Sequence, residues 1–134
     1  MNSVCVIGLG YVGLPLALLS AEKGYTVYGM ENNLHKAEKL LKVHPQLLIN
    51  HSDALASDVI IIAVPTPVDE SKNPDLTPVR IACEQIVEHL TGKKQLIILE
   101  STVNPFVSRK FILPLFEEKG FIEGKDFFLA HCPE

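Results

Sequence analysis

The sequence predicts an α/β protein with a doubly wound, mainly parallel β-sheet and helices on both faces. Short β-branched runs alternate with segments of helical periodicity along the chain, which is the pattern of successive βαβ units. Residues 59–64, VIIIAV, are almost continuously apolar, as expected for a strand that helices cover on both faces. A glycine-rich motif separates the first expected strand from the first expected helix, which is typical of nucleotide-binding α/β folds.

Six strands and four helices are expected, with a helix between each pair of successive strands except the third and fourth. The strands are the β-branched or apolar runs at residues 4–7, 26–30, 47–49, 59–64, 96–99 and 127–130. The helices are the intervening segments at residues 11–23, 34–42, 78–90 and 105–119. Residues 65–75 contain three prolines and are expected to form a loop.

Glycine, proline and capping residues indicate where these helices begin and end. Gly24 is expected to cap the C-terminus of the first helix, because glycine adopts the left-handed conformation found there. Pro45 stops the second helix. Thr77 and Asn104 are the expected N-caps of the third and fourth helices, since each has a side-chain oxygen and precedes a proline.

Length and charge limit the classes of function. The chain has enough residues for one domain, which we expect to occupy residues 1–134. A formal net charge of −4 disfavours nucleic acid or an anionic membrane surface as a partner. No apolar run reaches the roughly 18 residues that a membrane-spanning helix needs. The N-terminal residues lack the basic region of a signal peptide.

Cysteine spacing gives no sign of a metal site. Cys5, Cys83 and Cys132 form no CxxC pair, so neither zinc nor a disulfide framework is expected, and a reducing cytoplasm fits this usage. His131 and Cys132 follow the last expected strand. A nucleophilic Cys–His pair is disfavoured there, because adjacent residues on an extended segment point to opposite sides.

Residues 8–13, GLGYVG, match the pattern GxGxxG and carry the main functional signal. Gly8 is expected to form the tight turn, Gly10 to let a pyrophosphate approach the backbone, and Gly13 to let the helix pack on the strand. The helix N-terminus then offers N–H donors and a favourable dipole to phosphates. This predicts a Rossmann-type dinucleotide site; the alternative is a glycine-rich turn with packing value only.

Glu31 and Lys36 bear on the choice of dinucleotide. Glu31 follows the second expected strand, where a carboxylate accepts hydrogen bonds from an adenosine ribose diol and repels a 2′-phosphate. NAD is therefore expected rather than NADP, although Lys36 nearby could tolerate a phosphate. The alternative interpretation of Glu31 is a solvated loop acid.

Two further strand ends carry hydroxyl groups. Val64 and Thr66 lie at the end of one apolar strand, and Ser101 and Thr102 follow the next. Ligands of open α/β sheets bind at the carboxyl ends of strands, so these residues are expected to face a cofactor. In a general interpretation the hydroxyls are helix caps or turn formers.

Four segments together resemble the UDP-glucose/GDP-mannose dehydrogenase family. They are VIGLGYVGLPLA at residues 6–17, VPTP at 64–67, ESTVNP at 100–105 and HCPE at 131–134. The segments occur in the family's order and span almost the whole chain, which makes the resemblance far more specific than the glycine motif alone.

The resemblance implies roles for individual residues. The implied contacts to NAD are Gly8, Gly10, Tyr11, Val12, Gly13, Glu31, Lys36, Val64, Thr66, Ser101 and Thr102. Thr102 is also expected near the chemistry. Glu134 matches a family glutamate that acts as acid and base around a thioester step. Residues 42–58 are shorter than the family's usual segment, which flanks the cofactor and so bears on its affinity.

The implied activity is two-step oxidation of C6 of a UDP-sugar to a uronate, with reduction of two NAD, in polysaccharide biosynthesis. The HCPE sequence is closer to the UDP-N-acetylmannosamine branch than to the UDP-glucose branch. The family's nucleophilic cysteine, active-site lysine and sugar domain lie beyond residue 134, so these residues alone are expected to be inactive; a homodimer is compatible. Two alternatives stay open: another β-hydroxyacid-type dehydrogenase, and a non-catalytic NAD-sensing module.

Overall fold

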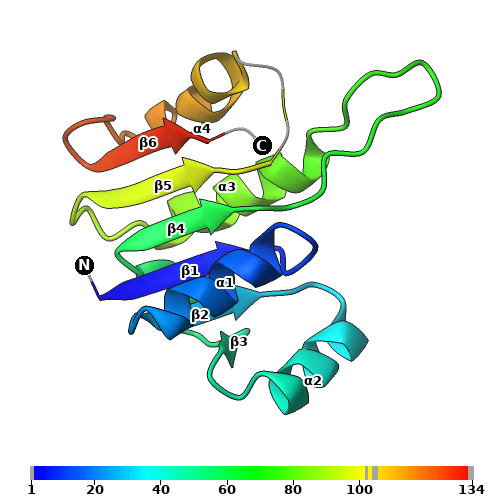
Figure 1. The fold of residues 1–134 in the computed structure, drawn as a ribbon. Coiled ribbons are helices and arrows are strands. Elements are labelled where there is room, and N and C mark those ends of the chain that lie inside the picture. Colours follow the sequence, from blue (N-terminus) through cyan, green and yellow to red (C-terminus); the bar gives the residue numbers. More distant parts are fainter. Residues whose placement is uncertain (1, 102, 104–105, 133–134) are drawn as a thin grey trace.

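The protein folds around one six-stranded parallel sheet (Figure 1). The computed structural model describes residues 2–101, 103 and 106–132. The strands are β1 (Ser3–Ile7), β2 (Thr26–Met30), β3 (Leu48–Ile49), β4 (Val59–Ile62), β5 (Gln95–Leu99) and β6 (Phe127–His131). Their spatial order is β3-β2-β1-β4-β5-β6, and every neighbouring pair is parallel. The predicted doubly wound sheet is confirmed.

Helices cover both faces of this sheet. They are α1 (Gly13–Glu22), α2 (Leu34–Val43), α3 (Thr77–His89) and α4 (Leu113–Glu117), with a 3-10 turn at Ala54–Ala56 and a π-helical turn at Ser108–Ile112. Side chains of α1 and α2 enter one hydrophobic cluster, and those of α3 and α4 enter another. None of the helices in the described part of the chain is long and apolar enough to cross a membrane.

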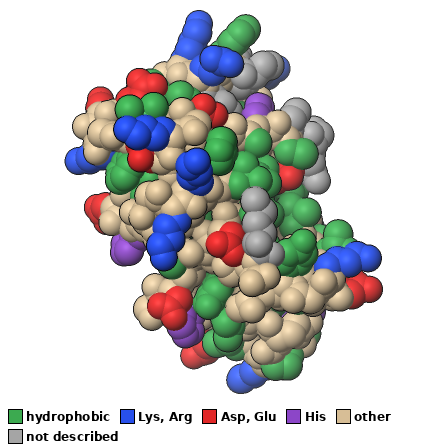
Figure 2. Space-filling view, turned by 90° about the vertical axis from the view of Figure 1, so that its left-hand side faces the viewer, with side chains coloured by type: hydrophobic (Ala, Val, Ile, Leu, Met, Phe, Trp, Pro, Cys, Tyr) green, Lys and Arg blue, Asp and Glu red, His purple; other side chains and the backbone are tan. Residues whose placement is uncertain are grey.

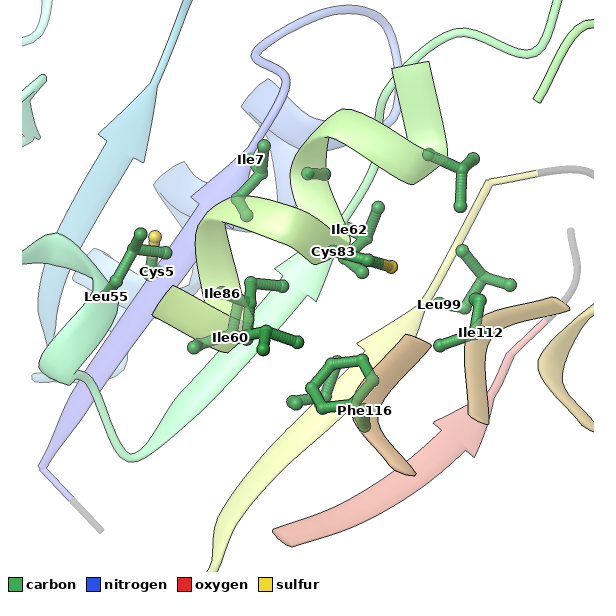
Figure 3. Packing of buried hydrophobic residues seen from close by; sticks show 14 of the residues in the cluster. Cys5, Ile7, Leu55, Ile60, Ile62, Cys83, Ile86, Leu99, Ile112 and Phe116 are labelled. Atoms are coloured by element: carbon green, nitrogen blue, oxygen red, sulfur yellow. The ribbon is translucent and has the colours of Figure 1, made fainter. Parts of the chain in front are cut away.

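The alternation of side chains along the central strands separates the two clusters. In β4, Ile60 and Ile62 point towards α3, whereas Ile61 joins the cluster under α1. Figure 3 shows the α3 side, where Cys83 and Phe116 meet the strand residues. Because both faces of β4 are buried, its sequence is continuously apolar, as the sequence analysis inferred.

Two helix starts differ from the expectation. Leu76, not Thr77, is the N-cap of α3, and the Asp75 carboxylate accepts the Thr77 N–H at 2.9 Å. The expected fourth helix is a π-helical turn followed by α4, because Pro114 has no N–H to donate to the carbonyl four residues earlier. The expected cap Asn104 lies outside the described residues.

A buried amide holds the N-terminal end of the sheet together. Gln95 opens β5 and is 3% exposed. Its Nε2 donates to the carbonyl oxygens of Leu55 at 2.9 Å and Ser57 at 2.7 Å. Its Oε1 accepts from the N–H and the hydroxyl of Thr91 at 3.1 and 3.2 Å. All the hydrogen-bonding capacity of this side chain is used, which links two loops to the strand.

Replacing Gln95 should therefore destabilise the domain strongly. Gln95→Leu keeps an apolar fit but leaves the buried carbonyl of Ser57 without its donor. We expect the free energy of unfolding to fall by about 2–4 kcal/mol, the usual range for breaking a buried polar network. Denaturant unfolding measures it, with Gln46→Leu at an exposed position as the matched control. Equal stability of the two variants would contradict the structural role of Gln95.

Candidate functional site

The cleft of the domain lies at the carboxyl ends of the strands. The chain moves outwards from β1 through β2 to β3 and then returns to start β4 on the other side of β1. Ligands bind at such a switch point in open α/β sheets. A cavity of about 770 Å³ occurs there. The opposite end of the sheet, in Figure 2, carries acidic and basic side chains mixed together.

Most of the predicted site residues line this one cavity. Those present in its wall are Gly8, Gly10, Tyr11, Val12, Glu31, Lys36, Val64, Thr66 and Ser101. Gly13 lies behind the wall as the first residue of α1. Thr102 and Glu134 fall outside the described residues. Residues predicted from four separate stretches of the sequence therefore lie around a common space.

The three motif glycines have different reasons to lack a side chain. Gly8 has φ +94°, and a Cβ there would lie 2.7 Å from the Ala63 carbonyl oxygen. A Cβ on Gly13 would collide with the Gly8 carbonyl. A Cβ on Gly10 would meet nothing within 4 Å, because that residue borders the cleft. Gly8 and Gly13 thus serve close packing, whereas Gly10 keeps the cleft open to a ligand that approaches the backbone.

The N-terminus of α1 opens into the same space. No side chain caps this helix, and its first turn carries no acidic residue. The first N–H groups of a helix have no partners inside it, and they bear the positive end of the helix dipole. An anionic group in the cleft near Gly10 and Val12 would meet these donors. The residues present therefore fit the pyrophosphate of a dinucleotide.

Glu31 is fixed at the end of β2. Its side chain is only 13% exposed; Oε2 accepts the Asn33 N–H at 3.0 Å, and Oε1 lies 3.4 Å from Lys36 Nζ. The Asn33 side chain in turn caps α2 by accepting the Lys36 N–H at 3.1 Å. The Glu31 carboxylate is thus oriented rather than mobile, and part of the Lys36 charge is already paired with it.

The hydroxyl groups at the ends of β4 and β5 differ in their surroundings. Ser101 is buried, and its Oγ donates to the Val64 carbonyl oxygen at 2.8 Å. This bond joins the two strand ends, which corresponds to the general interpretation of such hydroxyls as turn formers. Thr66 is half-buried and lies in the cavity wall.

Sequence reasoning missed one wall of the cleft. Pro78, Ile81 and Gln85 of α3 line the cavity, and Ile81 is 46% exposed although it is apolar. Asp75, just before this helix, also lines it, and hydrogen bonds from the hydroxyl and N–H of Thr77 hold the pKa of Asp75 below its usual range. The signal in the sequence was Ile81, an apolar residue on the otherwise polar face of the amphipathic helix α3.

Two of the three cysteines are not activated as nucleophiles. Burial raises the pKa of Cys5 to about 12, and burial with the nearby Glu84 does the same for Cys83, so both stay as thiols at neutral pH. Cys132 is exposed, and the Nε2 of the adjacent His131 is buried with no hydrogen-bond partner in the described structure. In the part of the chain that the structure describes, no group of three or more His, Cys, Asp or Glu side chains could hold a metal ion.

Comparison with known proteins identifies the family. The model of the "UDP-glucose/GDP-mannose dehydrogenase family, NAD binding domain" matches residues 2–55 and 46–134. The chain belongs to this family. Its cofactor is NAD, in agreement with the open Gly10 position and the oriented Glu31 carboxylate. The resemblance inferred from the four motifs is confirmed.

Named relatives point to UDP-sugar dehydrogenases. The chain is 38% identical to UDP-N-acetyl-D-glucosamine 6-dehydrogenase from Pseudomonas aeruginosa, over 98% of this chain and 35% of that protein. It is 36% identical to UDP-N-acetyl-D-mannosamine dehydrogenase from Methanococcus maripaludis, over 100% of this chain and 34% of that protein. The structure of UDP-N-acetyl-mannosamine dehydrogenase Cap5O from Staphylococcus aureus matches with a TM-score of 0.87 at 34% identity, over 99% of this chain and 37% of that one.

The comparisons also show a difference in length from the relatives. The chain spans about a third of the length of these proteins. The alignments to the first two run over 148 and 155 positions, although this chain has 134 residues, so the relatives carry residues where this chain has none. The family model matches in two parts that meet around residues 46–55. Both findings agree with a shortened segment between α2 and β4.

Substitutions of Gly10 and Gly13 are expected to have different effects. Gly10→Val should abolish NAD binding and leave the free energy of unfolding nearly unchanged, because the new side chain fills ligand space and φ at Gly10 is not positive. The substitution is therefore not expected to strain the backbone at this position. Calorimetric titration with NAD and thermal unfolding measure both effects, and Gly13→Ala, which should unfold the domain, is the comparison. Normal NAD affinity in Gly10→Val would place the pyrophosphate elsewhere.

Proposed function

We propose that this domain is the NAD-binding part of a UDP-sugar 6-dehydrogenase that oxidises UDP-N-acetylmannosamine, or a related UDP-sugar, to the uronate. The open cleft at Gly10 beside the oriented Glu31 carboxylate is the observation that carries the proposal. The names of the relatives support the sugar class. Bound NAD supplies the hydride acceptor, and two equivalents are reduced for each sugar carried from alcohol to acid.

The residues of this chain bind and orient the cofactor. The N–H groups of the loop from Gly8 to Val12 hold the pyrophosphate, and Glu31 accepts hydrogen bonds from the adenosine ribose. Lys36 stays beside the Glu31 carboxylate and orients it. Thr66 and the backbone around Ser101 face the nicotinamide half of the cleft, since β4 and β5 end there.

The remaining parts of the proposal concern the whole protein. Thr102 is assigned a position near the chemistry, and Glu134 the role of acid and base in the second oxidation step. The UDP-sugar and a second copy of the protein are the proposed partners. We also place the protein in the cytoplasm, because the number and spacing of its cysteines suggest no disulfide framework. Its proposed pathway is the supply of uronate sugars for polysaccharides.

The domain should prefer NADH to NADPH. A 2′-phosphate would approach the Glu31 carboxylate, and the Lys36 ammonium is already shared with that carboxylate. We expect NADH to bind at least about tenfold more tightly, a difference of roughly 1.4 kcal/mol. Fluorescence titration with both cofactors measures the ratio, and Glu31→Gln, which removes the charge alone, should narrow it. Equal affinities in the native domain would remove Glu31 from the ribose site.

Turnover should require more than these 134 residues. Hydride transfer needs the sugar held against the nicotinamide, and the thioester step needs a thiolate that neither Cys5 nor Cys83 can supply. We expect no NADH formation at 340 nm from the 134-residue domain with UDP-N-acetylmannosamine. A longer protein that joins this domain to the remaining two-thirds found in the relatives should form two NADH per sugar. Turnover by the domain alone that is lost in Cys132→Ser would refute this division of roles.

A further inference from the structure

One side chain outside the cleft binds both backbone polar groups of Glu31. The Asn50 Oδ1 accepts the Glu31 N–H at 2.9 Å, and the Asn50 Nδ2 donates to the Glu31 carbonyl oxygen at 3.0 Å. These two bonds repeat the pattern that a neighbouring strand would make with its backbone. The last residue of β2 that pairs with β3 is Gly29, and the amide extends this pairing along β2 to Glu31.

The backbone of Asn50 is held in the conformation that this contact needs. Asn50 has φ +52°, a left-handed conformation that asparagine tolerates better than most residues with a side chain. Its own N–H donates to the Gly29 carbonyl oxygen at 2.7 Å. Asn50 is thus anchored to Gly29 of β2 by its backbone, and its side chain extends beyond the end of β2 to Glu31.

The contact controls a residue of the cofactor site. Glu31 is the first residue after β2, so the strand ladder does not fix it. The two hydrogen bonds from Asn50 hold the Glu31 backbone in place. The Glu31 carboxylate then reaches the Asn33 N–H and Lys36 in one orientation. Asn50 also lies within residues 46–55, where the family model matches in two overlapping parts. The contact therefore belongs to the segment in which this chain departs from its relatives.

We propose that Asn50 is a positioning residue that fixes Glu31 and thereby sets the preference for NAD over NADP. The inference rests on the proposed role of Glu31 at the adenosine ribose. It assigns no direct contact between Asn50 and the cofactor, because Asn50 does not line the cavity. Without the amide, the Glu31 carboxylate keeps its charge but loses its fixed place beside the 2′ position.

The decisive variant is Asn50→Gly, which removes the amide and suits the left-handed backbone. Lys94→Gly is the matched control, because Lys94 also has a positive φ, of 60°, but precedes β5 at the end of the sheet away from the cleft. We expect Asn50→Gly to lower NADH affinity by about tenfold, the effect of losing one or two net hydrogen bonds. NADPH affinity should change less, so that the ratio of the two narrows, whereas Lys94→Gly should leave both affinities unchanged.

A second measurement needs no cofactor. Hydrogen exchange at the Glu31 amide should be slow in the native domain, faster in Asn50→Gly and unchanged in Lys94→Gly. Unchanged exchange in Asn50→Gly overturns the contact itself. Faster exchange with an unchanged NADH-to-NADPH ratio reduces Asn50 to a structural residue and overturns the inference. A native domain that folds but binds neither nucleotide overturns the proposed function, a result that the exchange data distinguish from failure of the Asn50 contact.

Discussion

The close approach of backbone to backbone at the glycine motif is the contact on which the rest of the structure depends. Gly13, the first residue of α1, lies directly against the Gly8 carbonyl, and Gly8 lies against the Ala63 carbonyl beyond β4. This contact holds the start of α1 against the turn after β1, and the helix lies over β1 and β2. The contact between Gly8 and Gly13 therefore directs the N-terminus of α1 towards the switch point of the sheet. The same contact thus serves both the packing of the helix and the binding of a ligand.

The two ends of the sheet have different roles: hydrogen bonds at one end stabilise the fold, and the other end holds the open cleft. At the N-terminal end, Gln95 uses all its hydrogen bonds, and the Asp58 carboxylate accepts the N–H groups of Asn2 and Ser3. These bonds hold the pKa of Asp58 below its usual value, so its contribution to folding is present near neutral pH and is lost as the pH falls through that lowered pKa. At the carboxyl end, the helix donors and the open cleft stay available to a ligand.

Local patterns in the sequence were sufficient for the fold and much of the site. The apolar run of β4 predicted a strand buried on both faces, and the glycine motif predicted where α1 would meet the cleft. The face of α3 with Ile81 was missed, because periodicity does not say which side of a helix borders an open space. Asn50 was missed because its contact with Glu31 joins residues 19 apart through a left-handed turn, which no local pattern reports.

The difference between Gly10 and Gly13 has an evolutionary consequence. A mutation at Gly13 is removed by selection against misfolding in any lineage, whatever the protein does. A mutation at Gly10 is removed only where the cofactor matters, since the fold tolerates a side chain there. A gene duplicate released from catalysis would therefore drift at Gly10 first while it keeps Gly8 and Gly13. That pattern of substitution would mark descendants that survive as scaffolds rather than as enzymes.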